Sequence, residues 1–129
     1  MIEYLVNAAL SPRDIVRVYE LSGIIRPTGD LPRIARMYAG SNMVISAWSQ
    51  GTLIGVCRAL TDFSYCCYLS DLAVIDEFQG QGVGTRLVEE LRSLLSDEVA
   101  LILLSAPGAM SYYPRIGFSP AENGVVIRR

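Results

Sequence analysis

The chain has 129 residues, of which 51% are apolar, and its formal net charge is −2; this favours one domain over residues 1–129 with a single hydrophobic core. The charge lacks the basic excess typical of nucleic-acid-binding proteins. No apolar run approaches the about 20 residues of a membrane-spanning helix and no basic, apolar leader precedes the fold, so we expect a cytoplasmic protein that binds neither nucleic acid nor membrane.

The first half of the chain is expected to contain a strand, two helices and a β-hairpin. Each helix is preceded by a capping residue, Ser11 or Asp30, and followed by a glycine, which are the usual start and stop signals. Two apolar runs flank Ser49-Gln50-Gly51 and predict the hairpin. The expected elements are a strand at 2–8, helices at 12–21 and 31–40, and strands at 43–48 and 53–62.

The second half has the order strand, glycine-rich turn, helix, strand. We expect strands at 65–74 and 99–104 and, between them, an amphipathic helix beginning near Val83. Such a crossover normally makes its two strands parallel. A short helix at 108–113 and a closing hairpin through Asn123-Gly124 complete the prediction. The fold class is therefore α/β: a mixed, mostly antiparallel central sheet with a parallel central strand pair and helices on both faces.

Two residue types are missing from the sequence, histidine and lysine. Without histidine there is no Ser-His-Asp or Cys-His nucleophile pair and no imidazole-based metal site. Without lysine there is no Schiff-base enzyme and no Walker loop. Cys57, Cys66 and Cys67 lack metal-ligand spacing, and we expect reduced thiols. The chemistry is thus expected to use backbone dipoles, carboxylates, Tyr, Arg or a bound cofactor, with no metal.

A glycine-rich segment lies between a predicted strand and a predicted helix. Alternate glycines let successive backbone N–H groups point into one concavity, and a helix start adds unpaired donors and its positive dipole end. A pyrophosphate fits such a cradle. The dinucleotide fingerprint fails at its last position, which argues against a Rossmann enzyme; a simple tight turn is the structural alternative. The predicted cofactor-binding residues here are Gln79, Gly80, Gln81, Gly82, Val83, Gly84 and Thr85.

Two separated segments resemble the signatures of the GNAT superfamily of N-acetyltransferases. The first is Asp71-Leu72-Ala73-Val74 followed by Gln79-x-x-Gly82-x-Gly84, and the second is Ala109-x-x-Tyr112-Tyr113-x-x-x-Gly117-Phe118. Together they cover about the second half of the chain. The sequence departs from the family at Asp76, where Pro is often found, and at Ala106, where Asn is often found. The resemblance implies acetyl-CoA as co-substrate and transfer of its acetyl group to a primary amine.

The resemblance also implies roles for particular residues. The pantetheine arm would pair with the backbone of Leu72, Ala73 and Val74, where an N–H group would face the thioester carbonyl as an oxyanion donor. The general acid would be Tyr113. A phenol with a pKa of about 10 can protonate a thiolate with a pKa of about 8.5 at a cost of only ~2 kcal/mol. The alternative role for Tyr113 is packing beneath the final hairpin.

The acceptor amine needs a base, because a primary amine with a pKa of about 10.4 is almost fully protonated at pH 7. Asp71 is the first candidate for this base. Asp62, Glu20 and a chain of water molecules are the alternatives.

In the GNAT family the acceptor pocket is usually built from the first helices and their loop. This implies Tyr19, Ile25 and Arg26 as substrate-binding residues, with Arg26 available for a substrate carboxylate. The acceptor is expected to be a small-molecule or protein amine. Sheet edges that are not obviously blunted make a homodimer plausible.

Direct attack in a ternary complex is the predicted mechanism, because no histidine-activated nucleophile exists. The sequence is also compatible with two alternative hypotheses. One is a non-catalytic sensor or interaction module that binds coenzyme A or acyl-CoA without transfer. The other is a different phosphate-binding fold.

Overall fold

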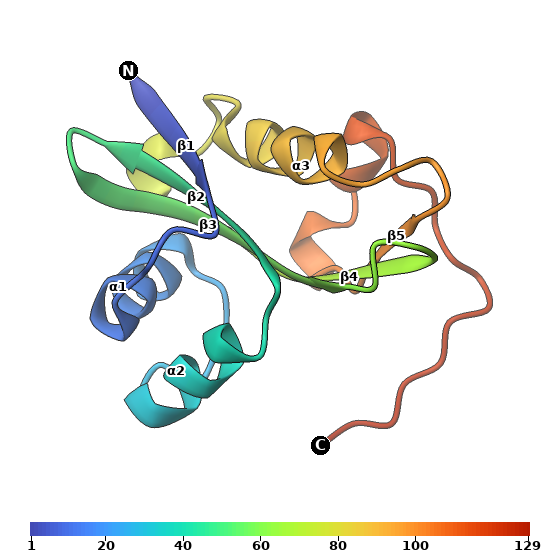
Figure 1. The fold of residues 1–129 in the computed structure, drawn as a ribbon, viewed down its shortest axis with the longest axis horizontal. Helices are drawn as coiled ribbons and strands as arrows, with labels where there is room; N and C mark the ends of the chain where they lie inside the picture. Colours follow the sequence, from blue (N-terminus) through green and yellow to red (C-terminus); the bar gives the residue numbers. More distant parts are fainter.

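The computed structural model describes all 129 residues and contains one five-stranded sheet with the strand order β1-β2-β3-β4-β5. Helix α3 covers one face of this sheet, and helices α1 and α2 cover the other (Figure 1). No helix is long and apolar enough to cross a membrane. The elements in chain order are β1 Ile2–Val6, α1 Pro12–Ser22, α2 Leu31–Ala39, β2 Met43–Ser49, β3 Thr52–Thr61, β4 Cys66–Val74, α3 Val83–Ser93 and β5 Ala100–Leu103.

Both N-terminal helices begin and end where local chemistry dictates. The hydroxyl of Ser11 accepts a hydrogen bond from the Asp14 N–H at 3.1 Å, and Gly23 ends α1 with a φ of 86°. The carboxylate of Asp30 caps α2 by accepting from the Arg33 N–H at 3.1 Å. A side-chain cap satisfies an otherwise unpaired first-turn donor, and only glycine adopts such a positive φ without strain. The predicted boundaries of these helices are confirmed within two residues.

The sheet is antiparallel except at one end. Strands β2 and β3 join through Gln50 and Gly51, whose φ angles of 49° and 78° are those of a two-residue hairpin turn. Strand β3 pairs with β4 in the antiparallel sense, and β4 pairs with β5 in the parallel sense. The predicted mixed sheet with one parallel pair and helices on both faces is therefore confirmed, but the parallel pair lies at the edge of the sheet and not at its centre.

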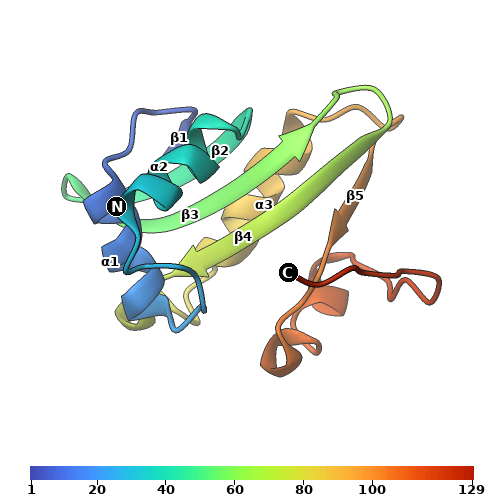
Figure 2. The same cartoon turned by 90° about the horizontal axis from the view of Figure 1, so that it is seen from below.

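Strand β5 pairs along its whole length, but only with the first part of β4. The parallel register runs from Cys66↔Ala100 to Leu69↔Leu103 and stops there. Strand β4 continues to Val74, still paired with β3. Beyond Leu69, β4 and the chain that follows β5 diverge and leave a gap along one edge of β4 (Figure 2). This gap positions the candidate site.

The C-terminal part differs from the prediction. The expected helix at 108–113 is replaced by two 3₁₀ turns, Pro107–Ala109 and Tyr113–Ile116, in a stretch interrupted by two prolines that lack an N–H donor. The expected hairpin through Asn123-Gly124 is wrong, since no strand follows β5. Its apolar run is only three residues long, and Val125 and Ile127 are fully exposed. A turn signal alone does not make a hairpin without a partner strand to bury against.

Candidate functional site

Six successive backbone N–H groups, from Gly80 to Thr85, donate to no acceptor within the protein. The first hydrogen bond of α3 comes from the Arg86 N–H to the Gly82 carbonyl, at 3.0 Å. The donors therefore include the unpaired first turn of the helix and the loop that enters it. Unpaired amides at the positive end of a helix dipole favour an anionic ligand.

Two glycines give this loop its shape. Gly80 and Gly82 have φ angles of 77° and 84°, in the left-handed region, and Gly82 is also the N-cap residue of α3. A side chain at either position would strain the backbone. The alternation of left-handed and ordinary conformations is the geometry that forms an anion-binding nest. Glycine is thus required at these two positions by the backbone conformation of the loop, and not only to make a tight turn.

The edge of β4 that faces the gap offers its own donors. The Ile75 N–H donates to the Ile54 carbonyl, 2.9 Å away across the sheet in β3. Because successive strand amides point in opposite directions, Ala73 also directs its N–H towards β3, whereas Leu72 and Val74 direct theirs into the gap. We expected the backbone of all three residues to pair with a ligand. The Ala73 backbone is instead paired with β3, so only Leu72 and Val74 have N–H groups available to a ligand.

The gap, the loop and the 3₁₀ segment enclose a pocket of about 350 Å³. This volume lies within the range of small-molecule sites, about 300–1,000 Å³. The pocket joins the glycine loop to the exposed edge of β4, so one elongated ligand can contact both. Its lining residues are Leu72, Val74, Phe78, Gln79, Gly80, Gly82, Val83, Gly84, Thr85, Ala109, Tyr112 and Tyr113.

Tyr113 lies in this pocket and is half-buried. Its ring packs edge-on against Phe118, with ring centroids 5.5 Å apart. Burial raises the pKa of the Tyr113 phenol, the neighbouring Tyr112 and Cys57 add to the rise, and the charge of Arg26 opposes it. The phenol is therefore protonated at neutral pH, as a proton donor must be.

Asp71 lies in the part of β4 that continues beyond its pairing with β5, but its environment is unfavourable for a general base. Its side chain has no exposed surface and is ion-paired with both Arg58 and Arg26. It also accepts a hydrogen bond from the Tyr19 hydroxyl at 2.8 Å. Burial would raise the pKa of this carboxylate, but the hydrogen bonds and charges of Arg58 and Arg26 outweigh it and lower the pKa. A buried carboxylate with a lowered pKa is poorly suited to take a proton from a substrate.

The first alternative base, Asp62, is also committed elsewhere. Its Oδ1 accepts the N–H groups of Ser64, Tyr65 and Cys66 at 2.8–3.1 Å and so closes the β3–β4 turn. These hydrogen bonds lower its pKa. Asp62 is thus a turn residue at the end of the sheet where β4 begins, away from the gap.

The three residues predicted to contact the acceptor lie in different settings. Tyr19 is fully buried, and its hydroxyl lies 2.7 Å from that of Tyr38, which contradicts a place on a binding surface. Ile25 is 89% exposed on the α1–α2 loop. Arg26 is partly exposed, and it ties that loop to β4 by donating to Asp71 and to the Ser70 carbonyl, the latter at 2.8 Å. Arg26 therefore sits at the closed end of the gap.

The side chain of Gln79 joins two elements of the fold, a role that the sequence motif alone does not predict. Its side-chain amide donates to the Val74 carbonyl at 2.8 Å and to the Ser22 carbonyl at 3.2 Å. It thereby joins the end of β4 to the end of α1, next to the glycine loop. Its backbone N–H donates to the Asp76 carbonyl at 3.2 Å. Gln79 thus shapes the loop, and its amide groups already have acceptors.

Arg58 and Tyr38 pack around Asp71 and Tyr19 next to the site. No role for either residue was predicted from the sequence. One signal was available for Arg58: a charged residue within an apolar strand must have a buried partner. The partner itself, Asp71, is 13 positions away and lies opposite it in the β3–β4 register. For Tyr38, whose ring also lies 5.7 Å from the Arg58 guanidinium, the sequence carried no local signal.

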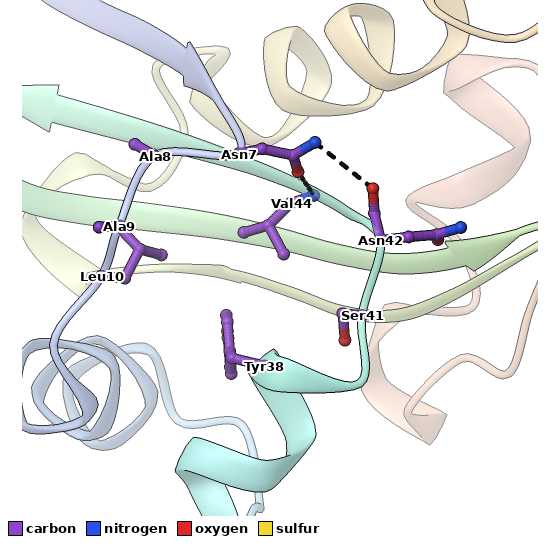
Figure 3. A pocket seen from close by; sticks show the side chains of 8 residues that line it. All are labelled: Asn7, Ala8, Ala9, Leu10, Tyr38, Ser41, Asn42 and Val44. Carbon is purple, nitrogen blue, oxygen red and sulfur yellow. Dashed lines mark hydrogen bonds between the residues drawn. The ribbon is translucent and has the colours of Figure 1, made fainter.

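A second pocket, of about 320 Å³, lies between the β1–α1 and α2–β2 connections (Figure 3). Its polar side chains are already paired. Asn7 Oδ1 accepts the Val44 N–H at 2.8 Å, and the Asn42 amide pairs with the Thr61 backbone at 2.7 and 3.0 Å. Its longest row of backbone N–H groups without an acceptor is that of Ala8, Ala9 and Leu10, three groups against the six of the glycine loop. We therefore place the candidate site at the gap beside β4.

Solved structures define the class of this fold. A probable acetyltransferase of unknown function from meticillin-resistant Staphylococcus aureus superposes with a TM-score of 0.84, at 19% identity over 100% of both chains. The aminoglycoside N-acetyltransferase AAC(6')-Iy, solved in complex with CoA, superposes with a TM-score of 0.73, at 14% identity over 100% of this chain and 95% of that one. The protein therefore has the acyl-CoA N-acyltransferase fold.

Comparison of the amino-acid sequence with known families and proteins identifies the family of this chain. Residues 31–127 match the model of the Acetyltransferase (GNAT) domain. Over 127 residues the chain is 30% identical to Histone acetyltransferase TAP1 of Glycine max, covering 85% of this chain and 55% of that protein. The chain spans between 29% and 55% of the length of three plant relatives that it matches. It belongs to the GNAT acetyltransferase family, and the resemblance seen in its motifs is confirmed.

Proposed function

We propose that this protein transfers the acetyl group of acetyl-CoA to a primary amine by direct attack within a ternary complex. The observation that carries this proposal is the row of six unpaired N–H groups, Gly80 to Thr85, next to the unpaired edge of β4. The row suits a diphosphate, and the strand edge suits an extended arm with its own amide groups. Coenzyme A has both features in that order, and family membership supports the assignment.

The residues of the gap divide the proposed chemistry between them. Bound acetyl-CoA supplies the activated carbonyl that an amine nitrogen attacks. The Leu72 N–H, which points into the gap, donates to the carbonyl oxygen as negative charge develops on that oxygen. In other enzymes, one such donor lowers the activation barrier by about 3 kcal/mol. Tyr113 then gives its phenolic proton to the sulfur as the C–S bond breaks. The products are an amide and a free thiol.

The acceptor amine is proposed to enter at the closed end of the gap, beside Arg26 and the exposed Ile25. Because the carboxylate of Asp71 is fully engaged by two arginines, we assign removal of the amine's proton to water. The α1–α2 loop would thus contact the acceptor through Ile25 and the exposed part of Arg26. A small-molecule amine and a protein amine both satisfy this arrangement.

A thiol-release screen tests the proposal. The protein is incubated with acetyl-CoA and a panel of small amines, amino acids and lysine-containing peptides, and free thiol is followed with a chromogenic disulfide. We expect acceptor-dependent release with at least one class and an acetylated product by mass spectrometry. Binding of coenzyme A without release by any acceptor would support the sensor alternative. Lack of any thermal stabilisation by coenzyme A would exclude both.

A further inference from the structure

The segment that carries Tyr113 has few hydrogen bonds to the rest of the protein. From 106 to 118 the backbone hydrogen bonds join residues at most five positions apart, such as the Phe118 N–H to the Tyr113 carbonyl at 3.1 Å. Apart from the Ser105 hydroxyl, which donates to the adjacent Ala106 carbonyl, one hydrogen bond leaves the segment, and it joins the hydroxyls of Tyr112 and Thr85, 3.0 Å apart. It connects the residue beside Tyr113 to the first turn of α3.

Gly84 makes room for this contact. A Cβ atom at position 84 would lie 3.1 Å from the Tyr112 hydroxyl oxygen and 3.8 Å from a methyl group of Val74. Such a 3.1 Å contact is tighter than ordinary van der Waals packing. The Tyr112 hydroxyl therefore rests against the start of α3 at the point where the helix, β4 and the 3₁₀ segment meet. All of these residues line the same pocket.

We propose that Tyr112 is a positioning residue for acetyl transfer: its hydrogen bond to Thr85 fixes the 106–118 segment on α3 and so holds Tyr113 over the gap. The inference rests on the proposed function. The two tyrosines are adjacent in the chain, and their rings pack edge-on with centroids 5.2 Å apart. A movement at Tyr112 is thus passed directly to Tyr113. General acids must lie within about 2.6–3.2 Å of the atom they protonate, and small misplacements strongly reduce rates.

The test removes the hydrogen bond from either side. In both Tyr112→Phe and Thr85→Val, we expect kcat to fall about fivefold, the effect of one lost neutral hydrogen bond, while the KM for acetyl-CoA stays nearly constant. The double variant should fall no further than either single variant. Thr85→Ser, which keeps a hydroxyl, should lose less than Thr85→Val. Tyr65→Phe is the matched control, because Tyr65 is 78% exposed and should retain wild-type kinetics.

A second cycle distinguishes positioning from a general structural role. If Tyr112 acts through Tyr113, Tyr112→Phe should have no further effect on kcat once Tyr113 is already Phe. An equal fivefold loss in that background would overturn the inference, as would an unchanged kcat in both Tyr112→Phe and Thr85→Val. A raised KM at constant kcat would make Tyr112 a cofactor contact instead. Absence of thiol release by the wild type with every amine is a different result and would remove the proposed function itself.

Discussion

Replacing Tyr113 by Phe should lower kcat about a hundredfold, the lower end of what general acids contribute, and leave the affinity for coenzyme A nearly unchanged. The substitution removes one hydroxyl and keeps the ring that packs on Phe118. The departing thiolate would then have to take its proton from water. Steady-state thiol release gives kcat, and thermal shift or calorimetry with coenzyme A gives the affinity.

The pH dependence of kcat, compared between the wild type and Tyr113→Phe, provides a second test of this role. Burial raises the pKa of Tyr113 above its usual value, which is about 10. A general acid is active only while protonated, so kcat of the wild type should keep this contribution up to about pH 10 and lose it at higher pH. The Tyr113→Phe enzyme should lack that alkaline fall. A variant with wild-type kcat, or with an unchanged alkaline fall, would contradict the role of Tyr113 as the acid.

Replacing Asp71 by Asn should destabilise the protein by about 3 kcal/mol, because removing one partner of a buried ion pair leaves its counter-charge uncompensated. Two arginines are affected: the side chain of Arg58 is 10% exposed and that of Arg26 is 26% exposed. Urea denaturation measures the loss. Asp97→Asn is the matched control, since Asp97 is exposed and has no ion pair; it should change stability little.

The effect of Asp71 should also depend on pH. Burial alone would raise its pKa, but the two arginines reverse the direction and hold the folded-state pKa below its usual value, about 3.9. A lowered folded-state pKa stabilises the protein above pH 4, and this contribution disappears as the pH falls through the folded-state pKa. The difference in stability between wild type and Asp71→Asn should therefore shrink in acid. An equal difference at pH 7 and pH 2 would contradict the ion-pair account.

Local signals predicted most of the fold. Ser11 and Asp30 cap helices, and Gln50-Gly51 forms a hairpin turn, because each involves atoms within a few positions in the chain. The hairpin at Asn123-Gly124 failed for the opposite reason. Its turn signal is as strong, but a hairpin also needs a partner surface, and that information is not contained in the turn.

The same distinction applies to the site. The conformation of the glycine loop was predictable, because it depends on consecutive residues and on the helix that follows. The role of Asp71 was not, because its partners Arg58 and Arg26 lie 13 and 45 positions away and meet it only in the folded sheet. Tyr19 is similar: its position on α1 was clear, but its burial against Asp71 depends on packing across 52 positions.

The row of amides from Gly80 to Thr85 carries the proposed coenzyme A site, and titration of the 15N-labelled protein with coenzyme A tests that site most directly. We expect the largest changes in backbone amide shifts at Gly80 to Thr85, with further changes at Leu72 and Val74. Changes concentrated instead around the second pocket, near Asn7 and Asn42, or no changes at millimolar coenzyme A, would contradict it.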